Sequence, residues 1–205
     1  MTGLWRIICL PENGNSKIAV AAQRKNDMVT AERFTSTDLG LMPDDGKRYE
    51  IIEGELYASK QPGVEHQYSC SRLCRFLDEW NDRSALGVVL TAPGLIFAED
   101  DDVAPDVVWI TRDRLMNTLD EAGHLHTAPE LVVEVLSPGK ANEYRDRQAK
   151  LKLYSRRGVQ EYWIVDAMQH PIEVYRRKRT RLVLDAPLYS EDTLTSPFLP
   201  GGCAP

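Results

Sequence analysis

The chain has 205 residues, 42% of them hydrophobic and 27% charged, which is the balance of one soluble globular domain. No apolar run approaches the roughly 18 residues that cross a membrane, and Met1 to Leu10 lack the pattern of a signal peptide. The four cysteines are too scattered for a disulfide scaffold, so we expect a cytoplasmic protein with no membrane partner.

The net charge of −6 is unevenly distributed. Residues 140–181 hold twelve Lys and Arg against five Asp and Glu, a net charge of +7, which leaves about −13 for the remainder. One basic segment on an acidic body is compatible with a phosphate-binding surface. A solvated helix and hairpin would explain the same pattern.

The first elements follow from local pattern. Residues 1–27 are polar and weakly patterned, so they predict a flexible N-terminal extension before a single domain over 28–205. Thr35 to Asp38 offer N-cap residues for a short helix that ends near Pro43. Tyr49 to Tyr57 then predict a β-hairpin that turns at Glu53 and Gly54.

A helix is predicted next, over about Glu65 to Asn81, because apolar residues recur there at spacings of three and four. Short strands follow at Gly87 to Leu90 and Leu95 to Ala98, and Glu99 to Asp102 predict an acidic turn.

Two strands then have near-continuous apolar runs, Asp106 to Ile110 and Leu131 to Leu136, as in central strands buried on both faces. A helix over about Glu143 to Arg156 ends at Gly158, a good C-cap. The remaining strands are predicted at Glu161–Asp166, Ile172–Tyr175 and Leu182–Leu184. The expected fold class is α/β or α+β, with a mixed sheet flanked by helices.

The most informative residue is Glu134, because a carboxylate within an apolar strand is costly to bury unless it is paired or binds a cation. The plainer explanation is a buried salt bridge, for example to an arginine of the next helix. Asp106 alone would be a turn or cap residue. Together, the two carboxylates could hold Mg²⁺, which needs only one or two of them.

The helix after Glu134 supplies candidates for the cation that a phosphodiester-cleaving site also needs. With Leu151 as the centre of its buried face, Lys150, Lys152 and Arg147 all lie close enough. Periodicity does not choose among the three.

Several histidines and cysteines are weaker candidates for metal ligands. His66, Cys70 and Cys74 form one helical stripe, but the ligands of a zinc site must converge on one point, so we expect buried core cysteines. His124 and His126 have no nearby metal-ligand partner in the sequence, and we expect them at the surface.

A basic hairpin turn is predicted near residues 176–181, where it would contact DNA phosphates or protect a sheet edge. The candidate nucleic-acid-binding residues are Arg176, Arg177, Lys178, Arg179 and Arg181.

Taken together, these motifs resemble the PD-(D/E)XK nuclease superfamily and, more closely, the Uma-two (Uma2) family of restriction-endonuclease-like proteins. The resemblance spans about Thr30 to Tyr175. Its matching pieces are Tyr49-Glu50, Gly54-Glu55-Leu56, His66, Pro105-Asp106, Glu134-Val135-Leu136-Ser137-Pro138, Asp146 with Lys150 and Tyr154, and Gly158-Val159 with Tyr162 to Asp166.

The resemblance implies a restriction-endonuclease-like mixed sheet and Mg²⁺- or Mn²⁺-dependent hydrolysis of phosphodiester bonds, with DNA as the expected substrate. Asp106 and Glu134 would bind the metal, and Lys150 would be the catalytic lysine. The superfamily lysine usually lies two residues after the glutamate, and this chain has Leu136 there. A non-catalytic nucleic-acid-binding or regulatory protein that keeps the fold is the alternative.

The resemblance also implies accessory site residues, and these are Glu50, His66, Asp146 and Tyr154. By the same comparison Met28 is a candidate start, and a homodimer is compatible with the analogy to other nucleases.

Overall fold

The computed structural model describes residues 33–168 and 171–199, so the expected extension at 1–27 and the candidate start Met28 lie outside the described residues. None of the helices in these two ranges is long and apolar enough to cross a membrane. The helical elements are α1 (Ser36–Leu39), α2 (Val64–Ser84), α3 (Arg112–Met116), α4 (Lys140–Tyr144), the π-helical turn η1 (Arg145–Lys150) and α5 (Leu151–Arg157). The strands are β1 (Arg48–Ile52), β2 (Glu55–Ser59), β3 (Gly87–Thr91), β4 (Leu95–Ala98), β5 (Asp101–Val103), β6 (Val107–Thr111), β7 (Leu131–Val135), β8 (Glu161–Val165), β9 (Ile172–Lys178) and β10 (Arg181–Leu188).

The main sheet has six strands in the order β10-β9-β8-β7-β6-β3. Its strands pair antiparallel except for β7 and β8, which are parallel. Parallel neighbours need a long crossover, and α4, η1 and α5 supply it. The helix that follows Glu134 in the chain is therefore held against the strand that carries Glu134.

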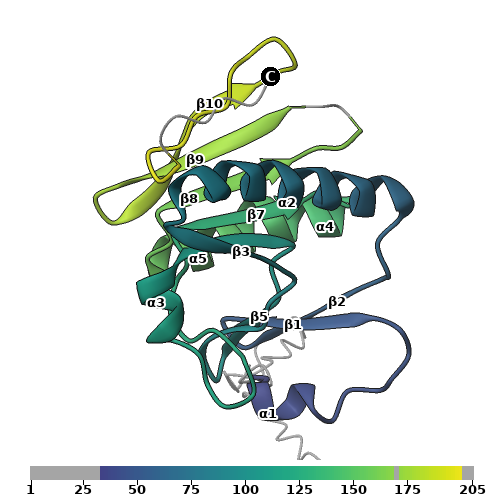
Figure 1. Ribbon diagram of the computed structural model, residues 1–205. Coiled ribbons are helices and arrows are strands. Elements are labelled where there is room, and N and C mark those ends of the chain that lie inside the picture. The colour runs from purple at the N-terminus through teal and green to yellow at the C-terminus, as the bar shows by residue number, and fades with distance from the viewer. Residues whose placement is uncertain (1–32, 169–170, 200–205) are drawn as a thin grey trace, which may run out of the picture. The chain divides into compact units, whose positions relative to one another are not determined.

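Each face of this sheet is covered, which explains why its central strands are apolar throughout. In Figure 1, α2 lies across the front of the sheet, while α4 and α5 lie behind it. Leu77 and Trp80 of α2 pack in one buried cluster with Val133. Leu153 and Tyr154 of α5 pack in the other with Val132. Successive β7 side chains alternate between the two clusters, and Glu134 falls on the side of α5.

A second sheet of four strands, in the order β2-β1-β5-β4, adds to the single mixed sheet that the sequence predicts. The predicted β1–β2 hairpin is present, with positive φ at Glu53 (53°) and Gly54 (75°) in its turn. The acidic turn expected over Glu99 to Asp102 is wrong in its second half, because Asp101 begins β5. Asp101 is fully buried and accepts hydrogen bonds from Arg156 and Arg157 of α5, partners that local pattern does not reveal.

The crossover helix begins at Lys140, three residues before the predicted start, and ends at Gly158 (φ 98°) as expected. Its buried face was predicted wrongly. Leu151 is only half-buried, whereas Lys150 is 1% exposed. The buried residues Asp146, Lys150 and Tyr154 recur at a spacing of four, so the buried face lies to one side of Leu151 rather than being centred on it.

Asn81 ties the C-terminal end of α2 to the main sheet. It accepts hydrogen bonds from the backbone N–H of Gly87 and from Trp109 Nε1, each at 3.0 Å, and donates to the Gly87 carbonyl at 3.0 Å. All three contacts are buried, so they hold the C-terminal end of α2 against the main sheet.

We expect Asn81→Ala to lower the free energy of unfolding by about 1–3 kcal/mol, because it leaves buried polar groups unpaired. Urea denaturation followed by circular dichroism measures the change. The control is Asn117→Ala, whose exposed side chain makes one hydrogen bond to the Asp113 carbonyl and should cost under about 0.5 kcal/mol. Equal losses in the two variants would contradict this role.

Candidate active site

Asp106 and Glu134 meet at one end of the main sheet. Strands β6 and β7 are antiparallel, with Val107 opposite Val133, so Asp106 lies beside Glu134 across the strand pair. The Val135 backbone N–H donates to Asp106 Oδ2 at 2.8 Å and holds that carboxylate against β7. The two predicted acids are therefore brought together, although their roles stay predictions.

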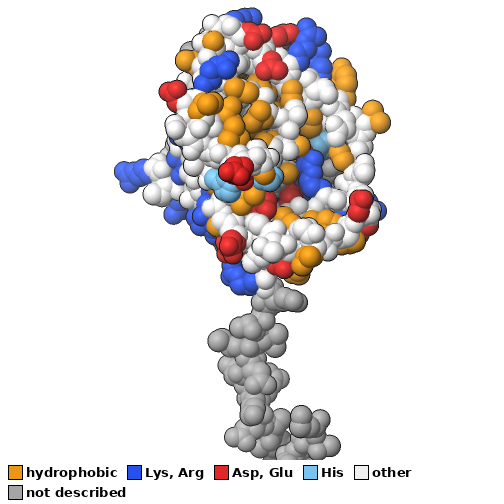
Figure 2. All heavy atoms as spheres, turned by 60° about the horizontal axis from the view of Figure 1, so that its bottom comes forward, with side chains coloured by type: hydrophobic (Ala, Val, Ile, Leu, Met, Phe, Trp, Pro, Cys, Tyr) orange, Lys and Arg blue, Asp and Glu red, His pale blue; other side chains and the backbone are white. Residues whose placement is uncertain are grey.

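Both acids line a small pocket between the end of the main sheet, the second sheet and the start of α2. The pocket is lined by Arg48, Glu50, Ser59, Lys60, Pro62, His66, Asp106, Glu134, Ser137, Arg145 and Lys150. Figure 2 shows acidic and basic side chains gathered in a hollow on this side of the molecule.

Lys150 joins the two sheets at the bottom of this pocket. Its ammonium Nζ lies 2.9 Å from Glu134 Oε1 on β7 and 2.9 Å from Glu50 Oε1 on β1. Tyr154 donates to the same Glu134 oxygen at 2.9 Å. The buried salt bridge considered for Glu134 is therefore present, but its partner is Lys150 rather than an arginine. Glu50 and Tyr154, two of the accessory candidates, are part of it.

Burial sets the charge of this group of residues. Burial alone would lower the pKa of Lys150, but Glu134, Glu50 and Asp146 raise it above its ordinary value, so the ammonium is charged. Burial raises the pKa of Glu134 to about 8; Lys150 opposes this shift, and Asp106, Asp146 and Glu50 add to it. Burial would also raise the pKa of Glu50, but Lys150 and Arg145 keep it lowered.

Asp106 has a different environment. His66 Nε2 lies 3.1 Å from Asp106 Oδ2, and Arg48 lies 3.5 Å from Oδ1. Burial would raise the pKa of Asp106, but the His66 hydrogen bond and charge, together with Lys150, leave it lowered. Asp106 is therefore anionic at neutral pH, and it lies next to Glu134, whose pKa is raised by burial.

Asp146 contacts Arg145, a residue of the pocket, and its carboxylate is paired with that guanidinium. It accepts hydrogen bonds from Arg145 Nε at 2.8 Å and Nη2 at 3.1 Å, and both residues are buried. The Arg145 guanidinium, which lines the pocket, lies 3.9 Å from Glu50. Sequence analysis did not identify Arg145, Arg48 or Lys60 as pocket residues, because nothing in their local pattern distinguishes them from surface cations.

The structure separates the three candidate helix cations. Lys150 enters the pocket. Lys152 is exposed and pairs with Glu53 at 2.7 Å, and Arg147 pairs with Glu173 at 2.7 Å. Lys150 is thus the one of the three that contacts the acids.

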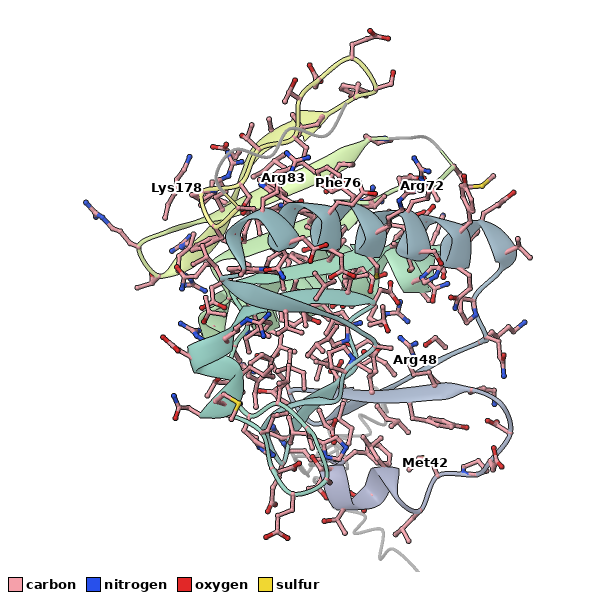
Figure 3. The ribbon with its side chains drawn as sticks, in the orientation of Figure 1. Met42, Arg48, Arg72, Phe76, Arg83 and Lys178 are labelled. Carbon is pink, nitrogen blue, oxygen red and sulfur yellow. The ribbon has the colours of Figure 1, made fainter. Side chains whose placement is uncertain are left out.

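The predicted basic hairpin, residues 176–181, lies away from this pocket. Arg176 pairs with the buried Glu161 at 3.0 Å, and Arg177 donates to the backbone carbonyls of Val159 and Ser155. In Figure 3, Lys178 lies at the opposite end of the main sheet from Arg48. Arg176 and Arg177 thus have structural partners, and a DNA contact by this hairpin stays a prediction.

His124 and His126 form a surface cluster with Asp120. Their ring nitrogens lie 3.3 and 2.9 Å from Asp120 Oδ2. They are at the surface as expected, and Asp120 is a possible ligand group beside them that was not associated with them from the sequence.

Comparison with known proteins identifies the fold and the family of the chain. A crystal structure described as that of "a putative nuclease belonging to DUF820" from Anabaena variabilis ATCC 29413 is similar over 81% of this chain and 90% of that chain, with a TM-score of 0.61 and 17% identity. At this identity the likeness establishes a nuclease-like fold. The chain belongs to the Uma2 family, whose model, described as "Putative restriction endonuclease", matches residues 37–204. No curated protein sequence matches it.

The raised pKa of Glu134 predicts how stability depends on pH. Between its ordinary value of 4.5 and about 8, the folded state keeps a proton that the unfolded chain has lost. Stability contributed by Glu134 therefore falls as pH rises through this window. In metal-free buffer we expect Glu134→Gln to lose less thermal stability than wild type between about pH 5 and about pH 8.

Thermal melting at several pH values in the presence of a chelator measures this difference. The control is Glu65→Gln at an exposed position of α2, which should follow the wild-type pH profile. Parallel profiles for wild type and Glu134→Gln would show that Glu134 does not bind the proton.

Proposed function

We propose that this protein is a metal-dependent endonuclease that hydrolyses phosphodiester bonds in DNA. The observation that carries the proposal is the Lys150 ammonium, held 2.9 Å from Glu134 and 2.9 Å from Glu50 beside Asp106 in one pocket. Two acids and a lysine at the edge of a nuclease-like sheet are the groups that the family resemblance assigns to metal binding and catalysis.

The donor chemistry fits a divalent cation. Asp106 is anionic, and both hydrogen bonds from Lys150 and Tyr154 fall on Oε1 of Glu134, which leaves Oε2 to bind an ion. Mg²⁺ and Mn²⁺ prefer such carboxylate oxygens. When bound, the ion would polarise a phosphate and lower the pKa of a water molecule. A cation here would also oppose the burial that keeps Glu134 protonated.

The chain's own cations would act on the substrate. Arg48 and Lys60 line the pocket, and Arg48 is partly exposed, so they are suited to bind phosphates of the DNA backbone. Lys150 and Arg145, which are buried, would place positive charge close to the scissile phosphate. Charge placed in a desolvated site before the reaction stabilises the transition state most strongly.

A non-catalytic role has one specific observation in its favour. Glu134 accepts hydrogen bonds from Lys150 and Tyr154, and burial raises its pKa to about 8, so these two neighbours would satisfy the buried carboxyl group in a protein that does not cleave DNA. A nucleic-acid-binding protein of the same fold would show binding without cleavage.

We expect Asp106→Asn to lower the rate of Mg²⁺- or Mn²⁺-dependent cleavage of plasmid DNA by about 10²–10³-fold, the effect of losing one charge-stabilising group. Cleavage is followed by gel electrophoresis. The control is Asp120→Asn, a partly exposed carboxylate outside the pocket that also contacts histidine and should leave the rate unchanged. Wild-type protein that binds DNA without metal-dependent cleavage would favour the non-catalytic role.

Binding to DNA separates the two candidate interfaces. We expect the double variant Arg48→Ala/Lys60→Ala to bind DNA more weakly. The slope of the logarithm of its association constant against the logarithm of the salt concentration should become shallower by about two, one unit for each lost phosphate contact. The matched double variant Arg179→Ala/Arg181→Ala, on the exposed part of the basic hairpin, should change the slope less. Fluorescence anisotropy at several salt concentrations measures both. The opposite order would identify the hairpin as the DNA interface.

A further inference from the structure

A second set of donor groups meets at Asp106. The ligand atoms of His66, Cys70 and Asp106 all lie within 4.8 Å of one another. His66 and Cys70 are on successive turns of α2, whereas Asp106 precedes β6, so helix packing brings the three together. The expected core position of the cysteines is confirmed, because Cys70 is buried and Cys74 packs, partly buried, against the same cluster. Asp106, which comes from outside the helix, gives His66 and Cys70 a third group that converges with them.

The surroundings of His66 fit an ion-binding imidazole. Its side chain is 10% exposed and lines the pocket that also holds Glu134. One ring nitrogen, Nε2, faces Asp106 at 3.1 Å, and the other, Nδ1, lies 3.6 Å from Cys70 Sγ. A ligating histidine commonly donates its second ring N–H to a neighbouring group, which fixes the tautomer. If an ion took the place of the hydrogen bond between Nε2 and Asp106, Cys70 Sγ could accept a hydrogen bond from Nδ1–H, and the lone pair of Nε2 would face the ion.

Cys70 itself fits this role better than that of a ligand. A metal-bound cysteine is a thiolate, and the Cys70 thiol is buried on the core side of α2.

The charged groups around the pocket are of both signs. The buried acids Glu50, Asp106, Glu134 and Asp146 pair with the cations Arg48, Arg145 and Lys150. A nitrogen ligand such as the imidazole of His66 would add affinity for an ion without bringing a further carboxylate into this buried site.

We propose that His66 Nε2 and Asp106 together bind a borderline divalent ion, such as Mn²⁺, Co²⁺ or Zn²⁺, with Cys70 as the acceptor that orients His66. Imidazole suits these ions, whereas Mg²⁺ selects oxygen ligands and retains water. This inference rests on the proposed function, since it shares Asp106 with that site, and it adds a nitrogen ligand that makes Mn²⁺ the preferred ion over Mg²⁺.

Pulsed electron paramagnetic resonance on Mn²⁺-loaded full-length protein tests the nitrogen ligand directly. Wild type should show coupling between Mn²⁺ and a histidine nitrogen, and His66→Ala should lose it. His66→Gln keeps a donor for Asp106 but lacks the imidazole, so it should lose the coupling as well while it retains the fold. Absence of coupling in wild type, or its persistence in both variants, overturns the proposal.

Calorimetry measures the expected preference between ions. Replacing His66 by Gln should weaken Mn²⁺ binding by at least about tenfold and leave the weaker Mg²⁺ binding nearly unchanged. His126→Gln, which alters an exposed histidine that also contacts a carboxylate, is the matched control and should bind Mn²⁺ like wild type. Equal losses for Mn²⁺ and Mg²⁺ in His66→Gln would assign His66 a structural role only.

Absorption of the Co²⁺-loaded protein tests the assignment of Cys70. We expect no sulfur-to-cobalt charge-transfer band in wild type, and an unchanged spectrum in Cys74→Ser. A band that disappears in Cys70→Ser would make Cys70 a direct ligand and overturn its orienting role.

The outcomes for the ion and for the reaction are separable. Nitrogen coupling without DNA cleavage would support the His66 site and contradict the proposed nuclease activity. Cleavage supported equally by Mg²⁺ and Mn²⁺, with no nitrogen coupling, would support the nuclease activity and overturn the His66 site.

Discussion

The site depends on the burial of one ammonium group. Lys150 is 1% exposed, and a charge in that position is tolerated only when carboxylates surround it. Glu134 on β7 and Glu50 on β1 meet this need from two different sheets, each at 2.9 Å. Removing one partner from such a pair commonly costs about 3–5 kcal/mol. The same contacts that solvate Lys150 therefore also fix the second sheet against the end of the main sheet.

This arrangement explains how the fold accommodates a lysine in an unusual place. The position two residues after Glu134 is Leu136, which packs in the hydrophobic cluster between the main sheet and α5. The ammonium instead comes from η1, in the middle of the crossover that returns the chain to the parallel strand β8. The buried residues of this π-helical turn are Arg145, Asp146 and Lys150. Local helix geometry thus replaces a strand position as the source of the positive charge.

Asp106 is shared by two groups of residues with different chemistry. Toward β7 it lies beside Glu134, and toward α2 it contacts His66, which in turn lies 3.6 Å from Cys70. An oxygen-only site and an imidazole–carboxylate site differ in the ions that they select. The position of α2 therefore bears on the chemistry of the pocket, and Asn81 secures that position at the far end of the helix.

The sequence by itself determined the features that have a local signature. Apolar runs identified β6 and β7, the hairpin turn followed from Glu53 and Gly54, and Glu134 stood out because its cost of burial is visible in one strand. The tertiary structure alone decided which groups converge. It selected Lys150 over Lys152 and Arg147, placed Glu50 and Arg145 at the site, and brought His66 to Asp106. Contacts between residues 16 to 100 positions apart leave no periodic trace, so the partners of Lys150 cannot be read from the pattern of its helix.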